Sequence, residues 1–306
     1  MNKNKTYLLG AVLVVLVIAA YFLTTDRGVK TETEKTPEKE KEFFALDSAN
    51  VDKIEIVRKN QKLVLQKIAG SWRQTEPVDY PVTASFVPPA VGDLKNFTLS
   101  TTVSTNPSKA DAYGFNDSSK TTVTVYEKGV LKGVLVIGNA GQGASQTFIK
   151  RPDKNAIYLA ENFLRMNFVK DNIDDWRDKL IVSIPSGSVK SIDFSYPGES
   201  FKITRDSLNR FMLGKDSIQF SNMEGYLNLL MNMNTQGFSS ANLDTVKKFT
   251  GVIKIDADKS YELNFLRVNE EPPYYLMRVA GNKQTFKFDE ALAKMMIKPR
   301  NEFVGK

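Results

Sequence analysis

The ionisable side chains of this chain restrict the chemistry that it could perform. Its 306 residues include no histidine and no cysteine. Without histidine there is no catalytic triad with a histidine base, almost no zinc catalysis and no usual general base near neutral pH. Any catalysis would depend on carboxylate, lysine or tyrosine side chains. No residue pattern indicates a reactive centre, so we expect no catalytic residue, no metal and no cofactor.

Two pairs of adjacent carboxylates are the strongest candidates for acid–base chemistry. Asp174 and Asp175 form one pair, and Glu270 and Glu271 form the other. Adjacent side chains on a strand or helix point in different directions, so neither pair converges by itself. A glycosidase with two carboxylates needs them about 5 to 10 Å apart across a cleft. We interpret both pairs as exposed polar positions and predict that the chain is not an enzyme.

The glycine-rich segment GNAGQG, residues 138–143, is the other motif that could bind a ligand. It lacks the lysine of a phosphate-binding loop and the glycine spacing of a dinucleotide site. The segment SQTFIKR that follows is typical of a strand, whereas a phosphate site would need a helix N-terminus there. We interpret the loop as a connection between two strands.

The chain is mildly basic, with a net charge of +7. This charge fits proximity to anionic headgroups or acidic polymers. No stretch interleaves clusters of lysine and arginine with aromatic residues in the manner of a nucleic-acid-binding module. We therefore expect no nucleic acid partner.

The elements that would hold these side chains occur twice in the sequence. Residues 51–73 read VDKIEIVRKNQKLVLQKIAGSWR, and residues 189–212 read VKSIDFSYPGESFKITRDSLNRFM. In both segments apolar and polar residues alternate, which predicts a hairpin that leads to a third short strand. The matched pairs are Val51 and Val189, Ile54 and Ile192, Leu65 and Ile203, and, after one added residue, Trp72 and Phe211.

The internal similarity continues to the end of the chain. Three further pairs of segments correspond, namely 122–138 with 252–266, 146–151 with 274–279, and 157–166 with 286–295. A long repeat of this kind predicts two homologous α+β halves. We predict a first repeat at residues 43–183 and a second at 184–306, each an antiparallel sheet with short helices on one face.

Each half also contains a segment with helical spacing. In the second half, residues 221–238 place an apolar stripe on one helix face, which we interpret as core. The counterpart at residues 83–97 is interrupted by Pro88 and Pro89, so we expect a broken helix there. The stripe consists of Met223, Tyr226, Leu227, Leu230 and Met233.

An uncharged apolar run near the N-terminus predicts a single membrane anchor at residues 1–24. Seventeen helical residues rise about 25 Å, the short end of what spans a bilayer. Lys3 and Lys5 precede the run, so the N-terminus would stay in the cytoplasm and the rest would lie outside a bacterial inner membrane. A cleaved signal peptide is the alternative. The anchor residues are Tyr7, Leu8, Leu9, Val12, Leu13, Val15, Leu16, Ile18, Tyr21, Phe22 and Leu23.

Residues 25–42 form a spacer of alternating charge. Val29 is its single large apolar side chain, so the segment cannot bury enough apolar surface to offset the entropy of ordering it. We interpret it as a disordered tether that holds the folded part away from the membrane.

The hydrophobic pattern resembles a family of uncharacterised proteins, domain of unknown function 4340. The resemblance is carried by Val-Asp-Lys-Ile-Glu-Ile at 51–56, Gly-Ser-Trp at 70–72, Ala-Tyr-Gly-Phe at 112–115 and Val-Leu-Val-Ile-Gly at 134–138. It covers roughly residues 44–180 and extends more weakly into the second half. The family implies a membrane-anchored partner of ABC-type transporters, similar to those of gliding-motility gene clusters, and it implies no catalytic residue.

Three functions remain open from the sequence. The first is an extracytoplasmic accessory subunit that binds a multi-span ABC-type permease. The second is a free-standing protein that binds a lipid or glycan between its halves, and the third is a carboxylate-dependent enzyme acting on glycans. For the first function, we expect the contact residues to be Tyr274, Tyr275, Trp176 and Arg177, in an exposed loop and at a sheet edge.

Overall fold

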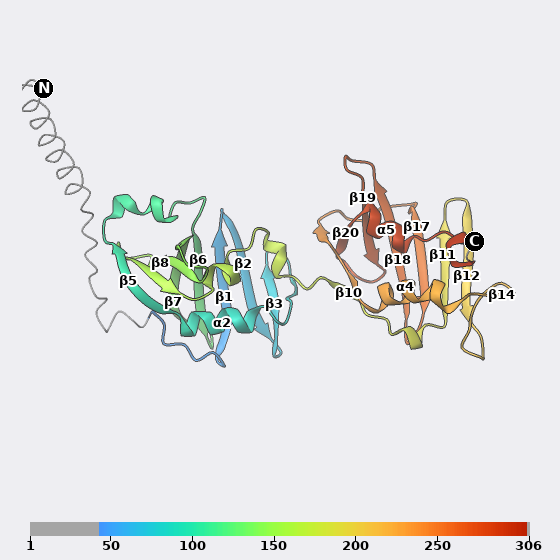
Figure 1. The fold of residues 1–306 in the computed structure, drawn as a ribbon, viewed down its shortest axis with the longest axis horizontal. Helices are drawn as coiled ribbons and strands as arrows, with labels where there is room; N and C mark the ends of the chain where they lie inside the picture. The colour runs from blue at the N-terminus through green and yellow to red at the C-terminus, as the bar shows by residue number, and fades with distance from the viewer. Residues whose placement is uncertain (1–42, 305–306) are drawn as a thin grey trace, which may run out of the picture. The chain divides into compact units, whose positions relative to one another are not determined.

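The computed structural model describes residues 43–304, which divide into one unit ending at Asp175 and another beginning at Trp176 (Figure 1). The anchor predicted at residues 1–24 and the spacer predicted at 25–42 lie outside the described residues. Within residues 43–304, no helix has the length and apolar character needed to cross a membrane.

The first unit is built on a nine-stranded antiparallel sheet with the order β4-β3-β2-β1-β6-β7-β8-β9-β5. Its helices are α2 (Val87–Asn96) and α3 (Leu164–Phe168), with short 3₁₀ turns at η2 (Pro107–Lys109) and η3 (Asp111–Tyr113). A third 3₁₀ turn, η4 (Ile173–Trp176), ends at the first residue of the second unit. Its strands are β1 (Val51–Arg58), β2 (Gln61–Ile68), β3 (Ser71–Glu76), β4 (Tyr80–Pro81), β5 (Thr98–Ser104), β6 (Thr121–Glu127), β7 (Val130–Ala140), β8 (Gln146–Lys150) and β9 (Ile157–Glu161).

The second unit has its own nine-stranded antiparallel sheet, with the order β14-β13-β12-β11-β17-β18-β19-β20-β16, and a small sheet of β10 (Leu180–Val182) and β15 (Met233–Asn234). Its helices are η5 (Ser186–Ser188), α4 (Phe220–Met231), α5 (Glu290–Met296) and α6 (Asn301–Val304). The large sheet consists of β11 (Ser191–Tyr196), β12 (Glu199–Arg205), β13 (Phe211–Leu213), β14 (Asp216–Ser217), β16 (Gly237–Ser239), β17 (Gly251–Asp256), β18 (Ser260–Val268), β19 (Tyr274–Val279) and β20 (Thr285–Asp289).

The two large sheets have the same strand order, with β1 to β4 corresponding to β11 to β14 and β6 to β9 corresponding to β17 to β20. The prediction of two large antiparallel sheets with few short helices is confirmed. The residues matched in the sequence also pair alike. Ile54 lies opposite Leu65 and Val125, and Ile192 lies opposite Ile203 and Ile255.

One apolar helix stripe in each unit provides much of the core. In α2 the buried residues are Val87, Ala90, Val91 and Leu94, and in α4 they are Met223, Tyr226, Leu227 and Leu230. Both sets follow the i, i+3, i+4, i+7 spacing of one helix face. Figure 1 shows α2 lying across the first sheet. The stripe predicted at residues 221–238 is therefore core, and each large side chain fully buried there contributes about 1.5–3 kcal/mol.

The prolines of the first unit start its helix instead of breaking it. Pro88 and Pro89 lie in the first turn of α2, after the N-cap residue Phe86. Backbone N–H groups of a first turn have no partner within the helix, so proline loses no hydrogen bond there and its fixed φ suits the helix. The expected break at residues 83–97 does not occur. The helix runs without interruption from Val87 to Asn96.

The division between the units falls before the boundary that the repeat suggests at Ser183. Residues 176–183 belong to the second unit because β10 pairs with β15. Two backbone hydrogen bonds extend this attachment, from Thr235 N to Lys179 O at 2.9 Å and from Ile184 N to Leu230 O at 2.9 Å. The small sheet therefore attaches the connecting segment to the end of α4.

One buried polar side chain distinguishes the two cores. Gln74 in β3 has no exposed surface, and within residues 43–304 neither its amide nitrogen nor its amide oxygen has a hydrogen-bond partner. Gln74 lies opposite Leu65, and Leu213 lies opposite Ile203 at the matching place in the second unit. Leu213 is buried and apolar. The matching positions therefore hold a buried amide in the first unit and a buried apolar side chain in the second.

We predict that Gln74→Leu raises the free energy of unfolding by about 1–2 kcal/mol, because burying an unpaired amide is unfavourable. The reciprocal change Leu213→Gln should lower it by about 2–4 kcal/mol. Urea unfolding of the full chain, compared with the wild type, measures both effects. A loss of stability in Gln74→Leu would mean that the amide has a favourable partner.

Candidate functional site

The carboxylate pairs named from the sequence lie in local turns of different units. Asp174 and Asp175 are part of η4, where Asp174 N bonds Asn172 Oδ1 at 2.9 Å and Asn172 N bonds Asp175 Oδ2 at 3.3 Å. Glu270 and Glu271 are exposed in the connection between β18 and β19. Within residues 43–304, no group of three or more acidic side chains could hold a metal ion.

Three of the four residues expected to form an exposed contact surface are buried instead. The exposed fraction is 2% for Trp176, 3% for Arg177 and 7% for Tyr275. Tyr274 is half-buried, with the amine of Lys287 4.0 Å from its ring centre. The expectation of an exposed surface at these residues is therefore corrected. They pack within the fold and leave only part of Tyr274 accessible.

The contacts of Arg177 explain why this charged side chain is buried and not exposed as expected. Its guanidinium lies 3.7 Å from the ring centre of Phe238 and donates a hydrogen bond to the side-chain oxygen of Gln284. The amide of Gln284 donates in turn to the carbonyl oxygens of Ser239 and Thr285, at 3.2 and 2.6 Å. A planar guanidinium can stack and bond at once, which allows a charged side chain to be buried. Phe238 and Gln284 are both distant from Arg177 in the sequence, so no local sequence pattern predicts these contacts.

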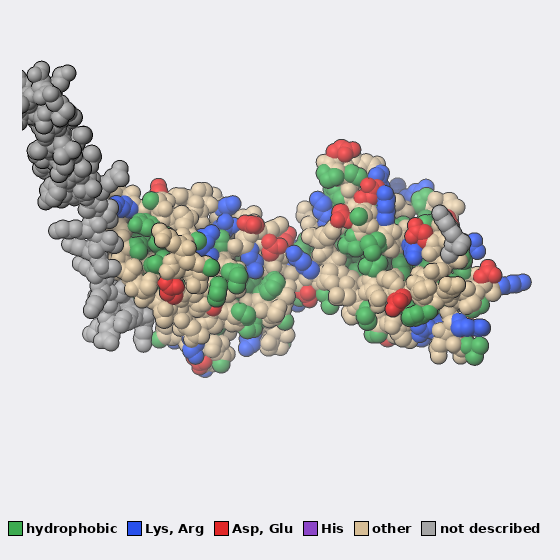
Figure 2. All heavy atoms as spheres, in the orientation of Figure 1, with side chains coloured by type: hydrophobic (Ala, Val, Ile, Leu, Met, Phe, Trp, Pro, Cys, Tyr) green, Lys and Arg blue, Asp and Glu red, His purple; other side chains and the backbone are tan. Residues whose placement is uncertain are grey.

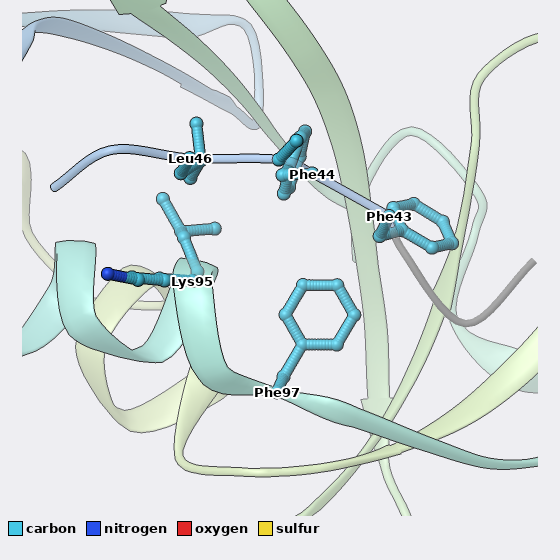
Figure 3. A pocket seen from close by; sticks show the side chains of 7 residues that line it. Phe43, Phe44, Leu46, Lys95 and Phe97 are labelled. Carbon is cyan, nitrogen blue, oxygen red and sulfur yellow. The ribbon is translucent and has the colours of Figure 1, made fainter.

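A groove lined by aromatic side chains lies where the described chain begins, in the first unit. It has a volume of about 440 Å³. Residues 43–46, which we call the entering segment, contribute one wall of the groove. The C-terminal end of α2 and Phe97, the residue after it, contribute the other (Figure 3). The lining residues are Phe43, Phe44, Ala45, Leu46, Leu94, Lys95 and Phe97.

Aromatic packing holds the entering segment against the fold. The Phe43 ring lies edge-on to the rings of Phe97 and Tyr158, at centre distances of 5.6 and 6.0 Å. The guanidinium of Arg151 lies 4.4 Å from the centre of the same Phe43 ring. Aromatic pairs of this geometry contribute about 0.5–1.5 kcal/mol beyond their buried area. The spacer therefore leads directly into a segment that is fixed to the sheet.

Lys95 gives the groove a positive rim. It is exposed in the last turn of α2, where a cation favours the negative end of the helix dipole. No ion pair to Lys95 forms within the described part of the chain, and Figure 3 shows its amine directed away from the aromatic rings. An apolar wall beside a free ammonium group suits an apolar segment or ligand with a negative end. The sequence signal for this groove is the Phe-Phe pair directly after the spacer, which we did not interpret as a site.

Gly133 makes room for the second phenylalanine. A Cβ placed on Gly133 would overlap the ring of Phe44, which is itself 8% exposed. Gly133 lies in β7, so β7 and the entering segment touch at a point where only hydrogen fits. The position of the entering segment against the sheet therefore depends on Gly133, which is distant from it in the sequence.

We predict that Gly133→Ala displaces Phe44 and lowers the free energy of unfolding by about 1–3 kcal/mol, the usual effect of overpacking. Chymotrypsin should then cut beside Phe43 and Phe44 faster than in the wild type. The control is Gly92→Ala, in α2, where a Cβ would meet no atom within 4 Å. Alanine there should stabilise the helix by about 0.5–1 kcal/mol. Equal cleavage rates in both variants would show that the absence of a side chain at Gly133 does not determine the position of Phe44.

Two of the motifs that carry the family resemblance contact each other. The segment 112–115 ends η3 with Gly114 at a φ of 81°, and a Cβ there would overlap the side chain of Asn139. On the other side, a Cβ at Gly138 would overlap the carbonyl oxygen of Tyr113 and lie 2.9 Å from Cζ of Phe115. The two glycines thus let the loop after β5 lie closely on the end of β7. Beneath that loop Phe115, Val136 and Ile157 form a small second core.

The family model described as "Domain of unknown function (DUF4340)" matches residues 72–250, more than half of the chain. The match begins in β3, includes both contacting motifs and ends at the residue before β17, so it extends across both units. No curated protein and no solved structure matches the chain.

Proposed function

We propose, because the chain belongs to the domain of unknown function 4340 family, that it is a membrane-anchored extracytoplasmic accessory subunit of an ABC-type transport assembly. It would act by binding protein and not by catalysis. The multi-span permease of the assembly is the proposed partner.

The observation that carries the proposal is the order of parts at the start of the chain. An uncharged apolar run at residues 7–23 and a charged spacer at 25–42 precede a segment that is firmly packed from its first described residue. Phe43, Phe44 and Leu46 are each less than 9% exposed. A tether attached in this way restricts the folded units to the neighbourhood of the membrane and raises their effective concentration near a membrane partner.

A row of charges on the second sheet supports binding to a protein surface. Lys202, Asp193, Lys254 and Glu262 lie side by side on β12, β11, β17 and β18. The ion pairs are 2.9 Å between Lys202 and Asp193 and 3.4 Å between Lys254 and Glu262. A hollow of about 340 Å³ follows the row. Exposed pairs contribute little to stability, but alternating charges set register and partner choice at an interface.

Binding of a lipid or glycan by a free-standing protein is the second candidate function. The observation that favours it is the aromatic groove of the first unit with Lys95 at its rim. This candidate function needs no permease, so cross-linking to a multi-span subunit distinguishes it from the first.

The proposed orientation predicts that protease added to intact spheroplasts removes the part of the chain after the spacer. The basic residues Lys3 and Lys5 precede the apolar run, which keeps the N-terminus inside. Immunoblotting against the C-terminal end measures the result. Protection of the domain until the membrane is breached would contradict the orientation.

The proposed partnership predicts that a photo-reactive residue at Tyr261, which lines the hollow, cross-links to a multi-span subunit in native membranes. The double reversal Lys202→Glu with Lys254→Glu should reduce this product several-fold, because the row then carries four acidic side chains in place of alternating charges. Lys294→Glu is the matched control, since Lys294 also pairs with a glutamate, Glu290, but lies on α5. If only the monomer is captured at native expression levels, the second candidate function replaces the first.

A further inference from the structure

Three of the four lateral edges of the two large sheets are protected against pairing with another strand. The edge strands β4 and β14 are two residues long, and β16 is three residues long. β4 contains Pro81 and β14 contains Asp216. Short strands, proline and charge are the usual means by which proteins prevent edge-to-edge association.

The fourth edge, β5, has none of these features. It is seven residues long and reads TLSTTVS, without a charge or a proline. Within residues 43–304, no strand pairs with its outer side, and it forms the end of the first sheet (Figure 1). About half of the backbone N–H and C=O groups of an antiparallel edge strand point outward, so β5 presents an open row of donors and acceptors.

The middle of β5 is regular. On its inner side β5 pairs with β9, with register shifts between Leu99 and Thr101 and between Thr102 and Ser104. Between these shifts Thr101 and Thr102 pair in order with Leu159 and Tyr158. The bulges lie on either side of Thr101 and Thr102 and twist the strand there, which makes the edge less regular, but they add no group that would repel a second strand.

We propose that β5 pairs in antiparallel fashion with β5 of a second copy of this chain, across a two-fold axis at Thr101. The strand is self-complementary about that residue. Leu99 of one copy falls opposite Val103 of the other, Ser100 opposite Thr102, and Thr98 opposite Ser104. Apolar residues therefore meet apolar residues and hydroxyls meet hydroxyls, both of which are favourable cross-strand pairs. A two-fold interface requires such self-complementarity.

Other occupants of the edge fit less well. The spacer at residues 25–42 is dominated by glutamate and lysine, which are poor strand formers, and it has no apolar pair to match Leu99 and Val103. A strand from a different protein would gain nothing from the symmetry of TLSTTVS. The symmetry has a use only when the two strands are identical.

The absence of cysteine from the chain permits a clean cross-linking experiment. Thr101→Cys in the full chain should form a disulfide-linked dimer under mild oxidation, because residues opposite each other in an antiparallel pair lie within disulfide reach. Ser239→Cys, on the corresponding edge strand β16, is the matched control and should yield several-fold less dimer. Non-reducing gels of native membranes and of the purified full chain measure both yields.

A second variant tests the strand edge itself. Adding Ser100→Lys and Thr102→Lys to the Thr101→Cys chain puts like charges opposite each other, so dimer yield should fall to that of the Ser239→Cys control. Circular dichroism and the urea midpoint confirm that the variant is folded. Equal dimer yields for Thr101→Cys and Ser239→Cys would overturn the proposal, as would an undiminished yield in the lysine variant. Capture of a different protein at Thr101→Cys in place of the dimer would overturn the second copy as occupant. None of these outcomes depends on the permease.

Discussion

Each unit depends on one constraint, which is that a nine-stranded sheet must bury its apolar face with very little helix. The chain has no cysteine and therefore no disulfide to assist. The longest described helix of each unit, with 10 residues in α2 and 12 in α4, contributes four buried positions with the same spacing. Strand register must bring the apolar residues under that helix, because a slip of one residue would turn them to the other face. The pairs Ile54–Leu65 and Ile192–Ile203 are where this requirement is met.

Much of this arrangement could be predicted because alternation and repetition are local signals. The hairpin at residues 51–73 and its counterpart at 189–212 have the predicted pairings. The predictions that failed depended on context. Proline breaks a helix only beyond its first turn, so Pro88 and Pro89 could not be judged without knowing where α2 begins. Arg177 looked exposed because its partner Gln284 is 107 residues away.

The interiors of the two units show that different side chains can perform one structural task. In the first unit, Nη1 of Arg58 donates a hydrogen bond to the carbonyl oxygen of Lys170 at 2.8 Å. Tyr196 occupies the matching place in the second unit, and its hydroxyl donates to the carbonyl oxygen of Lys298 at 3.1 Å. A cationic fork and a phenol thus anchor the segment that follows α3 or α5. Burial raises the pKa of the Tyr196 hydroxyl, so it remains a neutral donor over the physiological range.

The edges of the sheets differ more than the interiors do, and this difference has a consequence for assembly. A chain with two long unprotected edges could add a copy at each side and grow without limit, because repeated strand addition does not close. Among the four edges of the large sheets within residues 43–304, only β5 is long and uncharged, while its counterpart β16 has three residues. A single open edge that is complementary to itself stops growth at two copies. The short strand β16 therefore leaves β5 as an open edge that is compatible with a finite assembly.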